Sequence, residues 1–305
     1  MRMDETWKKH GTDWMEALKR TAPLVHSITN YVTVNDCANA LLAIGARPVM
    51  SHDPREAAEI TCGSQALELS LGATEYMEAM FRSAEVACEK GIPRVLDPVG
   101  ISGSTFRRDA LKRMLSSCPP TVIRGNYAEL HALLKNESTG TGVDAVADAA
   151  LSTLSRDVLA DAMQAYLRKL DFPLILIASG REDIVVSRDA YAYVQNGSPR
   201  MAQVTGTGCM ATELVAAFQA VGGEDRFQAA LLATAFMGIA GERADTWAPR
   251  GTGSFHIALI DALSTLTSEE LLTGARIHYG HKIETSPKGQ ELFSSGDRRK
   301  GGSPL

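Results

Sequence analysis

The sequence has few cysteines, and their spacing does not suit a disulfide framework or a structural zinc site. The five of them are an odd number without a CxxC pair: Cys37, Cys62, Cys88, Cys118 and Cys209. Small secreted domains and zinc-binding modules use close, paired cysteines. The cysteine pattern therefore favours a reducing compartment, and we expect a cytoplasmic protein.

Long apolar runs and an excess of one charge are also missing. The longest apolar run, AALLATAFMGIAG at 229–241, is too short to span a bilayer and is typical of a buried helix. The first residues lack the apolar core of a secretory signal. A formal net charge of −5 gives no reason to expect a nucleic acid or an anionic membrane as a partner.

Several well-known catalytic motifs do not occur. The chain contains no GxxxxGK[ST], HExxH or GxSxG, which excludes a Walker-type nucleotide site, a zincin and a nucleophile-elbow hydrolase. Its seven histidines are scattered, without metal-ligand spacing. We therefore expect structural roles for His26, beside a possible strand, and for His131, in a helix.

Helices and short strands alternate through the middle of the chain. Helices are predicted at 35–45, 75–91, 106–115, 127–134 and 157–170, and strands at 47–50, 93–97, 121–124 and 174–179. A hairpin is predicted after Gly180, and nearly continuous helix after Cys209. The pattern predicts an α/β fold, with a mostly parallel central sheet, helices on both faces and a helical C-terminal part. We expect one domain over 1–286 and a disordered tail over 287–305.

Polar or small residues follow nearly every predicted strand. In parallel sheets, ligands bind beyond the carboxyl ends of the strands, so these positions predict a cleft. They are Asn30, Met50 with Ser51, Asp97, Arg124 with Asn126, and Ser179 with Gly180.

The stretch VTGTGCMATEL, residues 204–214, combines a glycine-rich turn with the predicted start of a helix. The first amides of a helix have no partner inside the helix, and together with the helix dipole they attract anions. GTGCMA also fits the loose dinucleotide pattern GxGxxA, which requires a βαβ unit and an acidic residue about 20 positions on. Here Glu224 and Asp225 lie in a turn between two helices, so a phosphate-binding turn is the better interpretation.

Two carboxylates accompany this turn. Asp97 ends a hydrophobic strand, and Glu129 lies in the first turn of a helix, three residues after Asn126. Each could simply cap a neighbouring loop or helix. Facing an anion site together, they would suit a magnesium nucleotide, because Mg²⁺ takes one or two carboxylates beside waters and phosphate oxygens. That combination favours phosphoryl transfer.

Five blocks of the sequence resemble the hydroxyethylthiazole kinase family of the ribokinase-like superfamily. They run in order from about Pro23 to Leu266: PLVHSITNYVTVNDCANALLAIGARPVMS, IPRVLDPVG, TVIRGNYAEL, QVTGTGCM and GTGSFHIALIDAL. The resemblance implies transfer of the ATP γ-phosphate to the alcohol of 4-methyl-5-(2-hydroxyethyl)thiazole, in thiamine salvage. It further implies Mg²⁺ as cofactor and a homotrimer with active sites at subunit boundaries.

The resemblance also implies roles for individual residues. Met50, Gly206 and Asn30 would lie at the thiazole, and Asp97 and Glu129 would hold magnesium through water. Arg124, Ser179 and Asn126 would contact ATP. The turn Gly206–Thr207–Gly208 would present its amides to the transferring phosphoryl group, where preorganised donors act by electrostatics.

Cys209 stands where most ribokinase-like enzymes have an aspartate that serves as base. At a helix N-terminus its thiolate is favoured. It could act as general base or as a small group that orients the alcohol, and the orienting role suits a loose transition state better. Departures from the family pattern are Ser70-Leu71-Gly72, where Asn-Leu-Gly is common, and the insertion-like stretch 136–156.

Three other functions stay open at this point. One is a related small-alcohol kinase, such as one acting on hydroxymethylpyrimidine, although GTGC in place of the usual aspartate argues against it. Another is a nicotinamide-dependent oxidoreductase built on GTGCMA. The third is a catalytically silent relative that binds ATP or thiazole without forming ADP.

Overall fold

The computed structural model describes residues 6–135, 156–247 and 251–280, and its framework is a nine-stranded sheet. The strand order is β2-β1-β3-β4-β5-β6-β7-β8-β9. Neighbouring strands from β2 to β6 are parallel, and β7, β8 and β9 add antiparallel pairs at one end. The strands are β1 (Leu24–Ile28), β2 (Arg47–Val49), β3 (Ala66–Ser70), β4 (Arg94–Asp97), β5 (Val122–Asn126), β6 (Ile175–Ser179), β7 (Asp183–Val186), β8 (Tyr191–Val194) and β9 (Ile277–Tyr279).

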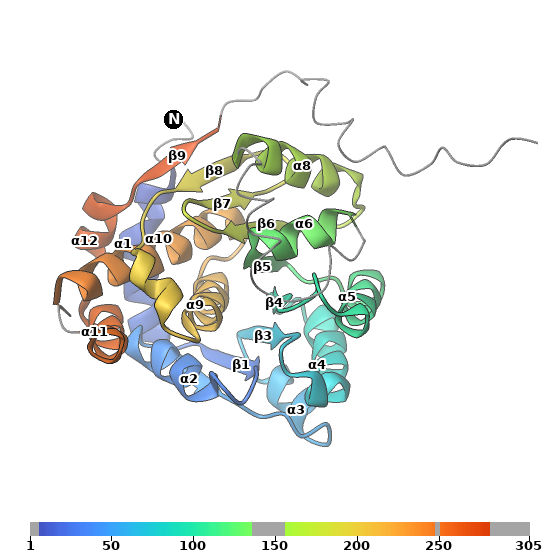
Figure 1. The fold of residues 1–305 in the computed structure, drawn as a ribbon. Helices are drawn as coiled ribbons and strands as arrows, with labels where there is room; N and C mark the ends of the chain where they lie inside the picture. Colours follow the sequence, from blue (N-terminus) through green and yellow to red (C-terminus); the bar gives the residue numbers. More distant parts are fainter. Residues whose placement is uncertain (1–5, 136–155, 248–250, 281–305) are drawn as a thin grey trace, which may run out of the picture.

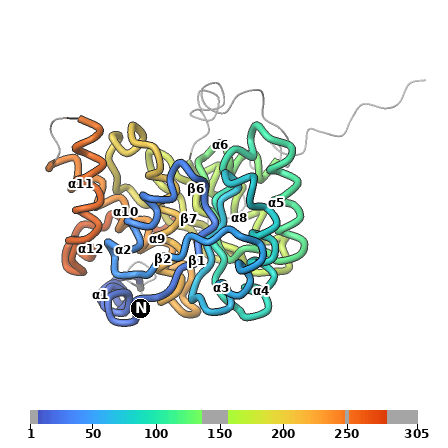
Figure 2. Tube along the Cα trace, turned by 90° about the horizontal axis from the view of Figure 1, so that it is seen from below, coloured from blue at the N-terminus to red at the C-terminus, as the bar shows by residue number. Residues whose placement is uncertain are grey.

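Helices cover both faces of this sheet (Figure 1). One layer consists of α1 (Thr6–Thr21), α2 (Val34–Ala43), α9 (Thr207–Val221), α10 (Arg226–Trp247), α11 (Thr252–Thr265) and α12 (Ser268–Gly274). The other consists of α3 (Ala57–Cys62), α4 (Met77–Glu89), α5 (Thr105–Ser117), α6 (Tyr127–Lys135) and α8 (Arg156–Lys169). The view from below in Figure 2 shows the same two layers, with α11 and α12 on one side and α4 and α5 on the other.

The two apolar cores explain why the strands are almost continuously hydrophobic. Successive residues of one strand enter opposite cores, because side chains alternate across a sheet. In β4, Val95 joins the core under α9 and α10, and Leu96 joins the core under α4 and α5. Full burial of such a side chain stabilises the fold by about 1.5–3 kcal/mol.

This architecture confirms the predicted α/β fold and its mostly parallel sheet. The predicted helices, the four strands and the hairpin all form, with boundaries within a few residues of those expected. Strand β1 was expected only as a possible strand beside His26, and β3 and β9 were not predicted. Strand β9 qualifies the expectation of nearly continuous helix after Cys209. The stretch 136–155 and the predicted tail after 286 lie outside the described residues.

Among the described residues, none of the helices combines the length and apolar character that crossing a membrane requires. The long, apolar α10 is instead packed within the layer that contains α9 and α11. That agrees with its interpretation as a buried helix.

Candidate active site

The centre of the candidate site is the N-terminus of helix α9. Gly206 is its N-cap and adopts φ +89°, in the left-handed region. The amide of Met210 donates to the carbonyl of Gly206 at 2.8 Å, so the amides of the three residues between them precede the first intrahelical bond. A Cβ at Gly206 would lie 3.1 Å from the methyl group of Thr33. This turn therefore needs glycine for both its conformation and its close approach to the start of α2.

Cys209 lies in the first turn of α9 and faces the loop after β1. The amide Nδ2 of Asn30 donates to its sulfur at 3.7 Å. Hydrogen bonds from Cys37, Thr33 and Asn30 and the charge of Arg124 lower the pKa of the thiol to about 6, against the opposing effect of burial. The pKa of Cys209 is lowered, as expected for this position, and the thiolate predominates at neutral pH.

Cys37, on α2, contributes most to that lowered pKa and was not singled out in the sequence. It is fully buried. Its interaction with Cys209 and the low-dielectric surroundings raise the pKa of Cys37 far above the ordinary value, so it stays a thiol, and its Sγ lies 3.9 Å from Oγ1 of Thr33. One buried cysteine thus stabilises the ionised form of the other.

Arg124 connects strand β5 to the same turn. Its side chain is buried, and Nη1 donates to the carbonyl of Gly208 at 3.0 Å. The side chain of Thr212 donates to that carbonyl as well, at 3.1 Å. The guanidinium therefore adds a fixed positive charge to an anion-attracting helix end.

Thr207 contributes differently from its neighbours. Its hydroxyl donates to the carbonyl of Met201 at 3.0 Å, which fastens the turn to the preceding 3₁₀ segment. Only its backbone amide is then available to an incoming anion. The side chain has a structural role, and the predicted catalytic contribution of Thr207 can come from the amide.

Asp97 ends strand β4 and is buried beside α9. The hydroxyl oxygen of Thr212 lies 3.4 Å from its Oδ2. Burial, followed by the negative charges of Cys209 and Glu129, raises the pKa of this carboxyl well above its usual value, and Arg124 opposes the rise. A carboxylate in this position would gain from a nearby cation.

Glu129 connects the loop after β4 to the end of β5 through both carboxyl oxygens. Oε1 accepts from the amide of Gly100 at 3.0 Å, and Oε2 accepts from the amide of Asn126 at 2.9 Å. The amide of Glu129 donates in return to Oδ1 of Asn126 at 2.9 Å. The reciprocal pair is a capping arrangement, as the spacing Asn126–Glu129 allowed.

These two carboxylates fit a hydrated magnesium ion rather than a ligand cage. Within the described ranges, no cluster of three or more His, Cys, Asp or Glu side chains is arranged to hold a metal. Asp97 and Glu129 are nevertheless close enough for each charge to affect the other, and both offer oxygen donors. Mg²⁺ usually keeps several waters and takes only one or two carboxylates, so the donor set is suitable.

Ser179 lies at the carboxyl end of β6, two strands away from Asp97 at the end of β4. It ends β6, pairs in register with Asn126 of β5, and its hydroxyl donates to the carbonyl of Gly125 at 3.2 Å. Gly125 itself is surrounded so closely that a Cβ would lie 2.9 Å from Glu129 Oε2. The carboxyl ends of β5 and β6 are thus closely packed beside Arg124.

Met50 lies at the opposite end, directly after the edge strand β2. The adjacent Ser51 is held by His26, whose Nε2 donates to the Ser51 carbonyl at 2.9 Å. Burial lowers the pKa of His26, so the ring is neutral and Nδ1 accepts from Thr61 at 2.7 Å. His26 has the predicted structural role, and it fixes the backbone next to Met50.

The region around Ser70 and Gly72 also reaches the site. The amide of Gly72 donates to the hydroxyl of Ser70 at 3.2 Å, and a Cβ on Gly72 would lie 3.5 Å from Nδ2 of Asn30. The tripeptide Ser70-Leu71-Gly72, which departs from the family pattern, therefore lies next to Asn30, the residue that donates to Cys209.

Three further buried polar residues were missed in the sequence: Ser27 on β1, Glu68 on β3 and Glu213 on α9. Glu213 follows Cys209 by four residues, so the helical spacing could have placed it on the same face. Nothing local indicates Ser27 or Glu68, because only the sheet brings them to α9.

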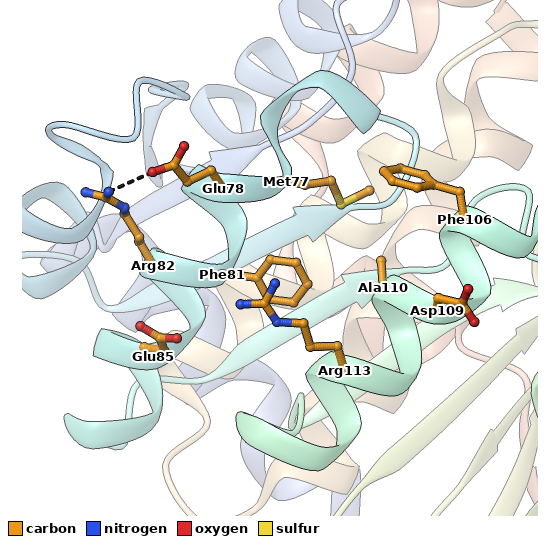
Figure 3. Close-up of a pocket in the computed structure, with 9 residues that line it drawn as sticks. All are labelled: Met77, Glu78, Phe81, Arg82, Glu85, Phe106, Asp109, Ala110 and Arg113. Carbon is orange, nitrogen blue, oxygen red and sulfur yellow. Dashed lines mark hydrogen bonds and ion pairs between the residues drawn. The ribbon is translucent and has the colours of Figure 1, made fainter.

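A groove on the molecule is lined by a different set of residues (Figure 3). It has a volume of about 540 Å³ between α4 and α5, and Phe81, Phe106 and Arg113 are among its lining side chains. The guanidinium of Arg113 stacks on the ring of Phe81 at 3.7 Å. None of the candidate site residues lines this groove. We therefore place the candidate active site from the positions of its side chains, and not from the volume of a cavity.

The sheet order and the helices on both of its faces define a ribokinase-like fold. A pyridoxal kinase from Staphylococcus aureus, solved in complex with AMP-PCP, shares this fold with a TM-score of 0.50 at 15% identity. The similarity covers 72% of this chain and 88% of that one.

Closer relatives identify the family. The model of the hydroxyethylthiazole kinase family matches residues 15–269. A hydroxyethylthiazole kinase from Clostridium beijerinckii is 43% identical over 257 residues, which is 83% of this chain and 91% of the relative. The hydroxyethylthiazole kinase structure from Pyrococcus horikoshii matches with a TM-score of 0.77 at 31% identity, covering 90% of this chain and all of that one. The chain belongs to the hydroxyethylthiazole kinase family, as the sequence blocks implied.

Proposed function

We propose that this protein transfers the γ-phosphoryl group of ATP to the primary alcohol of 4-methyl-5-(2-hydroxyethyl)thiazole, for thiamine synthesis by salvage. One observation carries the proposal: Cys209, with a pKa of about 6, is held against Asn30 at the same helix end that Arg124 flanks. An acceptor alcohol and a phosphate can therefore meet at one turn.

The phosphoryl group would bind at the turn of α9. The amides of Thr207, Gly208 and Cys209 stand before the first intrahelical hydrogen bond, and Arg124 is fixed beside them. Charge on the equatorial oxygens increases in a loose transition state, and donors already in place stabilise it without reorganisation. ATP would extend from here along the ends of β5 and β6, past Asn126 and Ser179.

The acceptor would lie between Met50, Asn30 and Gly206. The Cys209 thiolate accepts a hydrogen bond from the alcohol, which orients the attacking oxygen, and receives the proton late in the transfer. Loose phosphoryl transfer needs little help from a base before that stage. The orienting role and the proton-accepting role then belong to successive moments of one reaction.

Magnesium is the metal we propose, held by Asp97 and Glu129 through water. When bound there, the ion would offset the negative charge of the ATP phosphates. Asp97 would supply the more direct contact, because both oxygens of Glu129 already accept backbone amides. Removal of divalent cations with EDTA should abolish turnover, and Mg²⁺ should restore it.

A homotrimer with the site at subunit boundaries is also part of the proposal. Apolar side chains are exposed directly beside the acceptor position, with Tyr31 at 75% and Val32 at 58%. Ile257 on α11, which packs against α2, is 67% exposed. Light scattering should give three times the chain mass, and Val32→Asp should lower both the mass and the activity. We further propose a cytoplasmic location, where ATP is available and cysteines remain reduced.

A coupled ADP-release assay with a panel of alcohols tests the function. ADP formed with hydroxyethylthiazole alone supports the proposal. ADP formed only with hydroxymethylpyrimidine would show that the protein is a kinase for that alcohol instead. No ADP with any alcohol would favour a catalytically silent relative. A dinucleotide enzyme is disfavoured because α10, not a strand, follows α9, and nicotinamide fluorescence would reveal binding.

A further inference from the structure

The loop that follows strand β4 connects the two carboxylates proposed for magnesium. Asp97 ends β4 and leads directly into Pro98, Val99 and Gly100. The amide of Gly100 then donates to Oε1 of Glu129 at 3.0 Å. The loop is therefore bonded covalently to one carboxylate residue and by a hydrogen bond to the other. Whatever fixes this loop also fixes the position of one carboxylate relative to the other.

Arg107, on helix α5, holds the loop from outside the site. Its Nη1 donates to the carbonyl of Val99 at 2.9 Å. A Cβ on Gly100 would lie only 2.3 Å from the same nitrogen. Gly100 has φ +75°, which glycine adopts readily, and a methyl group there would displace the guanidinium. The arginine is thus packed directly on the loop.

The start of α5 directs Arg107 toward this loop. The hydroxyl of Ser104 caps the helix by accepting from the amide of Arg107 at 3.3 Å. Side chains of a helix lean toward its N-terminus. Because Arg107 lies in the first turn, its half-buried side chain reaches back over the residues that precede the helix.

We propose that Arg107 is a positioning residue for the magnesium site, which holds the loop after β4 so that Asp97 and Glu129 can share one hydrated ion. It acts through the carbonyl of Val99 and touches neither the ion nor the acceptor. Groups that orient metal ligands from outside commonly change the affinity for the metal by about 10- to 100-fold. The proposal rests on the proposed function in assuming that these two carboxylates hold magnesium.

The positive charge of Arg107 would have the opposite effect on a cation. Burial raises the pKa of Glu129, and the amides of Asn126 and Gly100 and the charges of Arg124 and Arg107 oppose the rise. The guanidinium is therefore near enough for its charge to act at the site, where it repels a metal ion. Loss of this charge alone should strengthen metal binding, whereas loss of the hold on the loop should weaken it. The direction of the change separates the two effects.

Nucleotide binding with and without magnesium tests the proposal. Isothermal titration calorimetry gives the Kd of a non-hydrolysable ATP analogue in EDTA and in Mg²⁺, and the first divided by the second measures what the metal contributes. In Arg107→Ala we expect this ratio to fall by about tenfold or more. Arg107→Lys keeps a charged donor and should recover most of the ratio. An unchanged or increased ratio in Arg107→Ala would overturn the proposal, and an equal loss of affinity in both media is such a case.

Arg108→Ala is the matched control. Arg108 is the next residue of α5 and is also half-buried, and its Nη1 donates to the carbonyl of Ile101 at 2.9 Å, one residue beyond Gly100. We expect Arg108→Ala to lose about as much stability in urea unfolding as Arg107→Ala, with an unchanged ratio. A fall in the ratio as large as that in Arg107→Ala would show a general loosening of the loop and would overturn the role assigned to Arg107.

The wild-type ratio separates this inference from the proposed function. A wild-type ratio close to one would contradict the magnesium site, and the role of Arg107 with it. A wild-type ratio well above one that Arg107→Ala leaves unchanged would overturn only the role of Arg107. Both measurements use the protein without turnover, so the kinase assay judges the reaction independently.

Discussion

The sulfur of Cys209 and the amide nitrogen of Asn30 lie 3.7 Å apart, although 179 residues separate them in the chain. This contact joins the carboxyl end of β1 to the N-terminus of α9. It places the residue that would orient an alcohol next to the turn that would bind phosphate.

Replacing Cys209 tests its role in turnover. Cys209→Ala should lower kcat by about ten- to a thousandfold, because the acceptor alcohol loses the group that orients it and takes its proton. The wild-type thiolate protonates as the pH falls through about 6, so wild-type kcat should fall below that pH. The alanine variant should lack this acid limb. Unchanged turnover in Cys209→Ala would remove the residue from the mechanism.

Cys37 should control the ionisation of Cys209. In Cys37→Ala the thiolate loses its main hydrogen-bond donor, so the pKa of Cys209 should rise toward the ordinary thiol value near 9. Cys37→Ser restores a donor and should reverse most of the change. The pH dependence of Cys209 alkylation gives both values, and equal profiles for the alanine variant and the wild type would contradict the assignment.

Gly206 can be tested against a matched glycine. Gly206→Ala places a Cβ at φ +89° and 3.1 Å from the methyl of Thr33. Gly223 has φ +56° and nothing within 4 Å of the corresponding Cβ, in the turn between α9 and α10. Both alanine variants should lose about 1–2 kcal/mol of stability in urea unfolding. Only Gly206→Ala should raise the KM for the acceptor, and an equal loss of activity in both would attribute the effect to strain alone.

Arg124 should affect ATP more than the acceptor. In Arg124→Ala the charge beside the helix end is lost, and we expect the KM for ATP to rise by about tenfold or more, equivalent to about 1.4 kcal/mol. Arg113→Ala, in the groove between α4 and α5, removes an arginine of the opposite layer and should leave this KM unchanged. A comparable rise in both variants would show a general effect of charge.

The two carboxylates should differ in what they contribute. Glu129→Gln weakens a cap that satisfies two backbone amides, so the free energy of unfolding should fall by about 1–3 kcal/mol. Asp97→Asn removes a buried carboxyl with a raised pKa, so stability should change little while the Mg²⁺ concentration needed for half-maximal activity rises. Thermal unfolding measures the loss of stability, and a magnesium titration measures the change in Mg²⁺ requirement. A loss of stability in Asp97→Asn with a raised Mg²⁺ requirement in Glu129→Gln would contradict this assignment.

The sequence predicted most strands of the sheet but not β3, for a physical reason. In ALELS, leucines alternate with Glu68 and Ser70, which suggests one face in water, whereas all five residues are buried. The polar side chains face α9, where Ser27 and Glu213 accommodate Glu68. Only the three-dimensional neighbourhood makes a buried glutamate acceptable there. The short β9 was missed because its partner among the described strands is β8, far back in the chain.

The site residues that could be predicted are those at strand ends or in glycine-rich turns. Asn30, Asp97, Arg124 and Gly206 occupy such positions, and the structure gathers them around α9. Cys37 lies in the middle of a helix with no motif of its own, and its effect depends on contact with Cys209. Residues that act through another side chain leave no local pattern.

The most direct test of the central claim is to identify the product. The purified protein is incubated with Mg²⁺, ATP and hydroxyethylthiazole, and the thiazole is examined by mass spectrometry and phosphorus NMR. We predict the gain of one phosphoryl group on the hydroxyethyl oxygen, at a rate strongly reduced in Cys209→Ala. Unmodified thiazole, with ATP intact or hydrolysed to free phosphate, would contradict the account.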